Sequence, residues 1–177
     1  MKEYRANFKE YLDDLGKKEP SPGGGSTVCL IFCTGVSLIE KAINYSFTDS
    51  NKSKDKKLQR YLKKFNVLRR LVYPYIDKDS YVFGMIMHSK RKKRDKFVEK
   101  SNDIIGRVGN SCCEAFSLAK GIESDIKKSI ISDFNIGLEL TKSALLGCIL
   151  NSEANQKIFG KKSKYTNRFK TVLKRWR

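Results

Sequence analysis

The spacing of apolar residues is the feature of this sequence that most restricts its fold. Apolar side chains recur three and four residues apart along most of the chain, which is the period of one helix face. No stretch alternates apolar and polar residues as a half-buried strand would. The pattern therefore predicts an all-α fold, a helical bundle with long central helices and a single domain over residues 1–177. A basic C-terminal helix is expected at about 161–177.

Predicted helices and their ends follow from this periodicity and from the positions of glycine and proline. Residues 48–55 are predicted to be a polar loop. The basic run at 90–96 is predicted to be either a connection or a solvated helical turn. Pro74 is expected to kink the third helix near its end. The predicted helices span about 8–15, 26–45, 58–75, 79–87, 97–119, 132–158 and 166–176.

The most apolar stretch, residues 28–43, is predicted to be a buried core helix. It is shorter than the roughly 20 residues that a membrane span needs, and it carries Glu40. The start of the chain, 1–16, is charged and lacks the apolar segment of a secretory signal. The 5 cysteines have no framework spacing, which suits a reducing compartment. We therefore expect a cytoplasmic protein that does not associate with membranes.

The positive charge of the chain predicts affinity for an anionic partner. The sequence has 37 Lys and Arg against 19 Asp and Glu, a net charge of +18, concentrated in 52–70, 90–94 and 161–177. Nucleic acid is one candidate partner. However, no zinc finger, RNP box, KH loop or basic-zipper pattern is visible. A small acidic ligand, such as a polyglutamylated cofactor, fits the charge equally well, and a plainly solvated surface is the third interpretation.

The strongest local motif is Pro-Ser-Pro-Gly-Gly-Gly-Ser at 20–26, directly before an apolar helix. Three successive glycines let backbone approach a ligand closely and leave N–H groups free to donate. The helix start adds a partial positive charge. No Gly-Lys-Ser/Thr follows and no strand precedes, so the motif is neither a P-loop nor a dinucleotide fingerprint. It predicts a cradle for an anion or a polar ring edge, or else a plain connection between helices.

Two carboxylates, Asp77 and Asp79, lie beside aromatic residues in the segment 75–83. Positions i and i+2 do not share a helix face, so at most one of them can point into a cleft. A carboxylate against apolar walls gains basicity and can serve as a general base. Helix N-capping is the alternative role.

Polar residues also occur at both ends of the long helix predicted at 132–158. Asp133 is near its start, where it can favour the helix dipole. Asn151 and Asn155 are four residues apart and share one face, so buried amides there need partners. A binding role and a buried amide pair or helix cap both fit.

Taken in order along the chain, these motifs resemble the cyclodeaminase/cyclohydrolase family. This family comprises the C-terminal domain of formiminotransferase-cyclodeaminase and the stand-alone methenyltetrahydrofolate cyclohydrolases. The resemblance covers the helix at 8–15 with the loop at 19–26, the acidic segment at 77–83, and the Ser-Asp pair 132–133 followed by Asn151 and Asn155. Gly35 falls on a family glycine of the central helix, and Glu114 resembles a family glutamate.

The resemblance implies an all-α bundle, a homodimer and one-carbon tetrahydrofolate as the substrate. It implies hydrolysis of 5,10-methenyltetrahydrofolate to 10-formyltetrahydrofolate, or closure of 5-formiminotetrahydrofolate with release of ammonia. Neither reaction needs a metal or a cofactor beyond the folate, whose glutamate tail the basic surface would attract. The implied catalytic acid/base is Asp79. The implied substrate-binding residues are Pro22, Gly23, Gly24, Gly25, Ser26, Asp133, Asn151 and Asn155.

Two questions stay open at the level of sequence. The absence of an attached formiminotransferase domain favours the cyclohydrolase over the cyclodeaminase. Departures from the family pattern, such as Gly109 and the pair 126–127, leave room for an inactive scaffold that binds nucleic acid or a protein. A cleft lined jointly by Asp79 and the glycine loop would favour the enzyme. If instead the C-terminal helix binds a partner, deleting 161–177 should abolish that binding and leave the fold intact.

Overall fold

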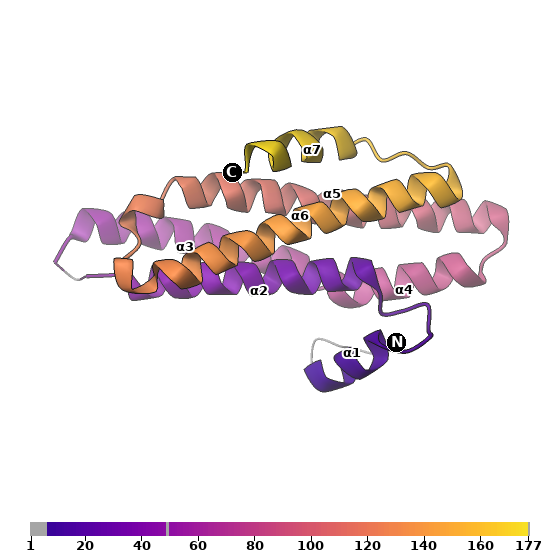
Figure 1. Cartoon of the computed structure of the whole chain (residues 1–177), viewed down its shortest axis with the longest axis horizontal. Helices are drawn as coiled ribbons and strands as arrows, with labels where there is room; N and C mark the ends of the chain where they lie inside the picture. Colours follow the sequence, from indigo (N-terminus) through magenta and orange to yellow (C-terminus); the bar gives the residue numbers. More distant parts are fainter. Residues whose placement is uncertain (1–6, 49, 177) are drawn as a thin grey trace.

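The computed structural model describes residues 7–48 and 50–176. All regular structure in these residues is helical, which confirms the predicted all-α bundle (Figure 1). Residues 1–6, 49 and 177 lie outside the described residues. They include the beginning of the predicted charged start, one residue of the predicted polar loop and the end of the predicted basic helix.

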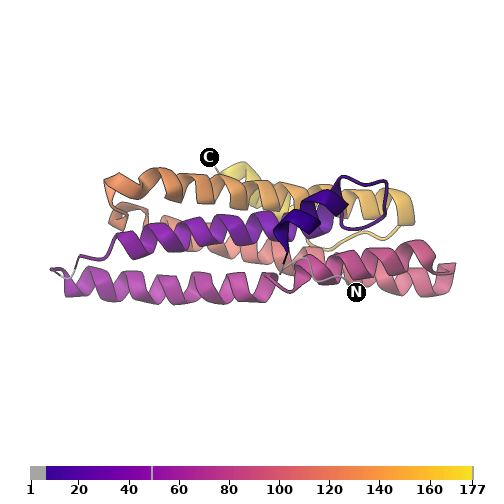
Figure 2. The same cartoon turned by 90° about the horizontal axis from the view of Figure 1, so that it is seen from below.

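The helices form an elongated bundle in which α2 and α6 run side by side in opposite directions (Figure 1). Helices α3 and α4 follow one another nearly end to end (Figure 2). Short 3-10 turns at Glu123–Asp125 and Lys128–Ile130 connect α5 to α6. The helices are α1 (Phe8–Leu15), α2 (Gly24–Tyr45), α3 (Lys52–Val72), α4 (Tyr75–His88), α5 (Arg91–Lys120), α6 (Ile131–Phe159) and α7 (Thr166–Arg175).

Three helices, α3, α4 and α5, begin four to six residues earlier than the sequence pattern predicts. The predicted loop at 48–55 is helical from Lys52, because the side chain of Asn51 caps α3 by accepting the Lys54 N–H at 3.0 Å. Pro74 does not kink one helix but separates two, with α4 starting at the next residue. Of the two interpretations of the basic run at 90–96, the helical one is right, because α5 begins at Arg91.

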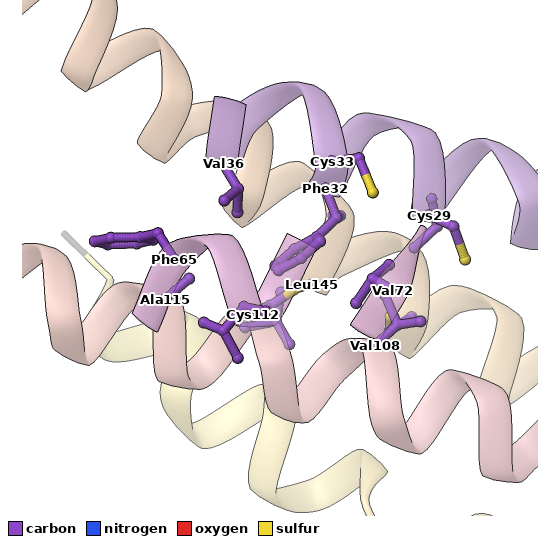
Figure 3. Packing of buried hydrophobic residues seen from close by; sticks show 14 of the residues in the cluster. Cys29, Phe32, Cys33, Val36, Phe65, Val72, Val108, Cys112, Ala115 and Leu145 are labelled. Atoms are coloured by element: carbon purple, nitrogen blue, oxygen red, sulfur yellow. The ribbon is translucent and has the colours of Figure 1, made fainter. Parts of the chain in front are cut away.

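The core is built around α2. Its side chains Phe32 and Val36 are fully buried and point toward Cys112 and Ala115 of α5 (Figure 3). The helix spans 22 residues and is long and apolar enough to cross a membrane by length and composition. It exceeds the 28–43 stretch predicted from sequence, but most of its apolar window is buried inside the bundle, as expected for a core helix.

Two glycines let α2 and α6 approach each other where they cross. A Cβ on Gly35 would lie 2.7 Å from the Gly137 carbonyl oxygen and 2.9 Å from Oγ1 of Thr141. A Cβ on Gly137 would in turn lie 2.7 Å from the Gly35 carbonyl oxygen. The two backbones therefore pack directly on one another at this crossing.

The C-terminal helix α7 is part of the core. Phe169 is 0% exposed and fits against Gly109 of α5, where a Cβ would overlap its ring. Trp176 stacks on Phe116 with ring centroids 4.0 Å apart. Removing 161–177 would uncover these contacts, so from the structure we expect this deletion to destabilise the fold rather than to leave it intact.

Candidate functional site

A cavity of about 540 Å³ opens at one end of the bundle. It lies where the start of α2 meets α4, the start of α5 and the end of α6, elements that gather at one end in both views (Figures 1 and 2). Its walls are mainly apolar, with few polar groups among them, which is the usual character of a small-molecule site. The apolar lining comprises Pro20, Phe83, Ile86, Met87, Ile105, Ala154, Ile158 and Phe159.

Asp79 is the acidic residue of this lining. It projects from the second turn of α4 and is 8% exposed. Burial raises the pKa of Asp79 to about 6, while the backbone N–H of Ser26 donates a hydrogen bond to it and acts in the opposite direction. The carboxylate therefore caps the start of α2, where the helix dipole favours negative charge. A group with a pKa near neutrality can both accept and return a proton.

The glycine loop closes around this carboxylate. A Cβ on Gly25 would overlap the carboxylate group of Asp79, so glycine is required for the two to lie together. A Cβ on Gly24 would lie 3.3 Å from Oδ1 of Asn151. Gly25 and Gly24 thus bring backbone within reach of an acid from α4 and an amide from α6, which favours the cradle over a plain connection.

Asn151 and Asn155 both line the cavity from the last third of α6. Asn155 is buried, and its Nδ2 donates to Oγ of Ser101 at 3.2 Å and to Oδ1 of Asn102 at 3.0 Å. Asn102 in turn donates to the carbonyl of Lys161 at 3.2 Å. Asn155 is therefore held in place by α5, which fits the predicted buried amide, whereas Asn151 faces the glycine loop.

Three predicted site residues do not line the cavity. Asp133 lies at the far end of α6 and pairs with Nζ of Lys41 at 2.6 Å, so the structure corrects its assignment to the same site. Pro22 is buried beside the cavity, and the fully buried Ser26 contributes its backbone N–H to Asp79. The remaining predicted residues, Gly23, Gly24, Gly25, Asp79, Asn151 and Asn155, do line it.

Several residues that line the cavity are not indicated by the sequence pattern. Arg94 is the charged one among them. It belongs to the basic run at 90–94, and nothing in that run distinguishes one cation from its neighbours. Ser80, Phe83 and Ser101 line the cavity as well. Only the helical register of α4 and α5 shows which of these side chains turn inward.

Buried thiols lie behind the site. Burial, with the nearby Asp79 charge, raises the pKa of Cys29 well above its ordinary value, so this thiol stays protonated. All 5 cysteines are free. Within the described ranges no cluster of three or more His, Cys, Asp or Glu has the arrangement of a metal site.

Comparison with known proteins shows the family and the fold of this chain. The sequence model of the formiminotransferase-cyclodeaminase family matches residues 7–174. The fold is similar to the crystal structure of formiminotetrahydrofolate cyclodeaminase from Thermotoga maritima, with a TM-score of 0.80 at 16% identity over 96% of this chain and 87% of that chain. No curated protein sequence gives a significant match. The chain belongs to the formiminotransferase-cyclodeaminase family, a family of folate one-carbon enzymes.

Proposed function

We propose that this protein hydrolyses 5,10-methenyltetrahydrofolate to 10-formyltetrahydrofolate, with Asp79 as the acid/base. The observation that carries the proposal is a buried carboxylate, with a pKa of about 6, facing a glycine loop inside a largely apolar cavity. The joint lining by Asp79 and the glycine loop is the arrangement that favours an enzyme over a basic binding scaffold.

The chemistry follows from the position of the carboxylate. The methenyl carbon bridges N5 and N10 in a cationic amidinium, which an ionised Asp79 would stabilise electrostatically. Water adds to that carbon while Asp79 accepts one of its protons. The bond between the carbon and N5 then breaks as the hydroxyl on that carbon loses its proton to solvent and becomes the formyl C=O on N10, and the protonated Asp79 returns its proton to N5. This reaction needs only water and the folate.

Cyclodeamination is the second candidate, because the structural neighbour is a formiminotetrahydrofolate cyclodeaminase. There the same carboxylate would take the proton of N10 as N10 attacks the formimino carbon, and would then protonate the departing ammonia. Both routes pass through a tetrahedral carbon between the two folate nitrogens. They differ in the substrate that the protein accepts, not in the residue that carries the proton.

The test offers both substrates to the wild-type protein. Methenyl absorbance should fall faster than the spontaneous rate if the protein is a cyclohydrolase. Methenyl absorbance should instead appear from 5-formiminotetrahydrofolate, with one ammonia per turnover, if it is a cyclodeaminase. Asp79→Asn should lower the active reaction by about 10²- to 10⁴-fold, the range for loss of a general acid/base. No reaction above background with either folate contradicts the proposal.

We also propose that the protein acts as a homodimer in a reducing cytoplasm. Apolar side chains on α6 remain exposed on one face: Ile136 is 53%, Leu146 45% and Leu150 56% exposed. Exposed apolar side chains gathered on one helix face are a feature of association surfaces. Light scattering should give twice the 20.3 kDa chain mass, and Leu150→Glu should reduce it. A monomeric wild-type protein contradicts this part.

A further inference from the structure

The cavity has two chemically different ends. Asp79, Gly24 and Asn151 lie at the inner end, whereas Met87, Arg94 and Phe159 lie at the outer end. Asp79 and Met87 are eight positions apart on α4, which corresponds to about 12 Å along a helix. Asn151 and Phe159 are also eight positions apart on α6, so both walls give the same length of about 12 Å.

Arg94 is the cation that lines the outer end. It belongs to the first turn of α5, and its guanidinium carbon lies 5.8 Å from the centroid of the Phe159 ring. Its Nε is completely buried, yet no hydrogen-bond partner for it exists in the described part of the chain. Because a completely buried atom cannot be reached from the cavity, the donors left for an anion there are the terminal N–H groups of the Arg94 guanidinium, which always carries its positive charge.

The wall between the two ends is largely apolar, with Asn155 and Ser101 as its polar members. Phe83, Ile86 and Ile105 line the stretch between Asp79 and Arg94. A ligand that fills the cavity would therefore carry a polar reacting group at one end, a flat apolar middle and an anion at the other. Guanidinium groups bind carboxylates with two parallel hydrogen bonds, which specifies both charge and orientation.

We propose that Arg94 binds a glutamate carboxylate at the far end of the folate and makes the cavity selective for ligands that carry this anion. The inference rests on the proposed folate reaction and extends it to the residue that sets specificity. In this arrangement the p-aminobenzoyl ring lies along Phe83 and Ile86, while the one-carbon group reaches Asp79. Arg94 then orients the substrate from a distance and takes no part in proton transfer.

The test compares two non-reacting ligands that differ only in the glutamate. Binding of 5-formyltetrahydrofolate and of the neutral carboxamide of 5-formyltetrahydropteroate, which has no terminal carboxylate, is measured by calorimetry on the wild-type protein, Arg94→Gln and Arg94→Lys. Arg91→Gln is the control, because it removes one charge from the same turn at an exposed position outside the cavity. The wild type should bind the glutamate-bearing ligand about 10- to 100-fold more tightly, the usual contribution of a hydrogen bond to a charged group.

Arg94→Gln should remove this preference without weakening binding of the neutral carboxamide, Arg94→Lys should retain part of it, and Arg91→Gln should leave it unchanged. Equal affinity of the wild-type protein for the two ligands overturns the role of Arg94 while leaving the folate reaction standing, and it does so even if the variants fail to fold. A preference that survives in folded Arg94→Gln overturns it as well. Failure of the wild type to bind either ligand overturns the proposed function and this inference together.

Discussion

The middle and the open end of the α2–α6 pair use the same kind of residue to opposite effect. In the middle, Gly35 and Gly137 bring two backbones into direct contact and leave no space. At the end, Gly24 and Gly25 admit polar side chains from α6 and α4, and a cavity of about 540 Å³ remains beside them. Glycine therefore allows close helix packing where the backbone of the other helix lies opposite. Where a polar side chain lies opposite, glycine leaves room for that side chain beside a cavity.

The largest expected effect on turnover comes from filling the space between Gly25 and Asp79 at the open end. Gly25→Ala places a methyl group where the Asp79 carboxylate lies, so the carboxylate must move. Because the general acid/base is displaced, turnover should fall by about 10²-fold or more. The measurement is the rate of methenyl-tetrahydrofolate loss at saturating substrate.

Gly23→Ala is the matched control for this substitution. Gly23 also lines the cavity, but a Cβ there meets its first neighbour only at 3.8 Å, and its extended backbone accepts alanine. Its turnover should remain within about threefold of wild type, because ordinary contact distances are kept. Equal losses in the two variants would mean that the glycines serve only the loop and not the carboxylate.

The next effect concerns stability and pH. Because burial raises the pKa of Asp79 from 3.8 to about 6, the folded state holds this proton more tightly than the unfolded chain. The wild-type protein should therefore lose stability relative to Asp79→Asn as pH rises from about 4 to about 6, by on the order of 3 kcal/mol, and the difference should be constant outside that window. Urea unfolding of both proteins at pH 4, 5, 6 and 7 measures it.

Asp79→Asn serves as the reference for the wild-type protein. The pH-dependent contributions of all other titrating groups are the same in both proteins and cancel in the difference. A difference that grows in the opposite direction, with the wild type gaining stability as pH rises, would mean that the hydrogen bond from Ser26 outweighs burial.

A smaller effect is expected at the closed crossing. Gly35→Ala forces its new Cβ to within 2.7 Å of a backbone carbonyl that cannot rotate away. The helices must separate slightly, which should cost about 1–3 kcal/mol in unfolding free energy. Activity per folded molecule should be retained, because Gly35 lies outside the cavity lining. Chemical unfolding and turnover together separate this behaviour from that of Gly25→Ala.

The smallest effect serves as the control for helix propensity. Gly84 lies within α4, and a Cβ there meets nothing within 4 Å. Gly84→Ala should therefore stabilise the protein by about 0.5–1 kcal/mol, the usual gain for alanine over glycine inside a helix. If Gly84→Ala destabilises the protein instead, the distance from an added Cβ to its neighbours does not predict the effect of alanine in these helices, and the comparison between the middle and the open end fails.

The sequence predicts the helices and most of the site because both depend on local patterns. Apolar spacing locates every helix, and the order of the glycine loop, Asp79 and the Asn151–Asn155 pair indicates one site. Asp133 shows the limit of this reasoning. The order of motifs along the chain does not show that the residues in them lie close together in space. The carboxylate of Asp133 pairs with Lys41 at the other end of α6.

Arg94 shows the complementary limit. The chain has 37 basic residues, and its composition does not show that the side chain of Arg94 lines the cavity. The role of Arg94 depends on the register of α5, which begins six residues before the predicted start at 97. The contact of Gly25 with Asp79 likewise joins residues more than 50 positions apart, and only the tertiary structure brings them together.

The most direct test of the central claim is the pH dependence of turnover at the carboxylate. The wild-type rate, corrected for spontaneous hydrolysis, should rise about tenfold per pH unit below pH 6 and level off above it, because the ionised Asp79 is the base. Asp79→Asn should show no such inflection and a rate lower by at least about 10²-fold. A wild-type profile without an inflection near pH 6, or an Asp79→Asn protein that keeps the wild-type rate, would contradict the account.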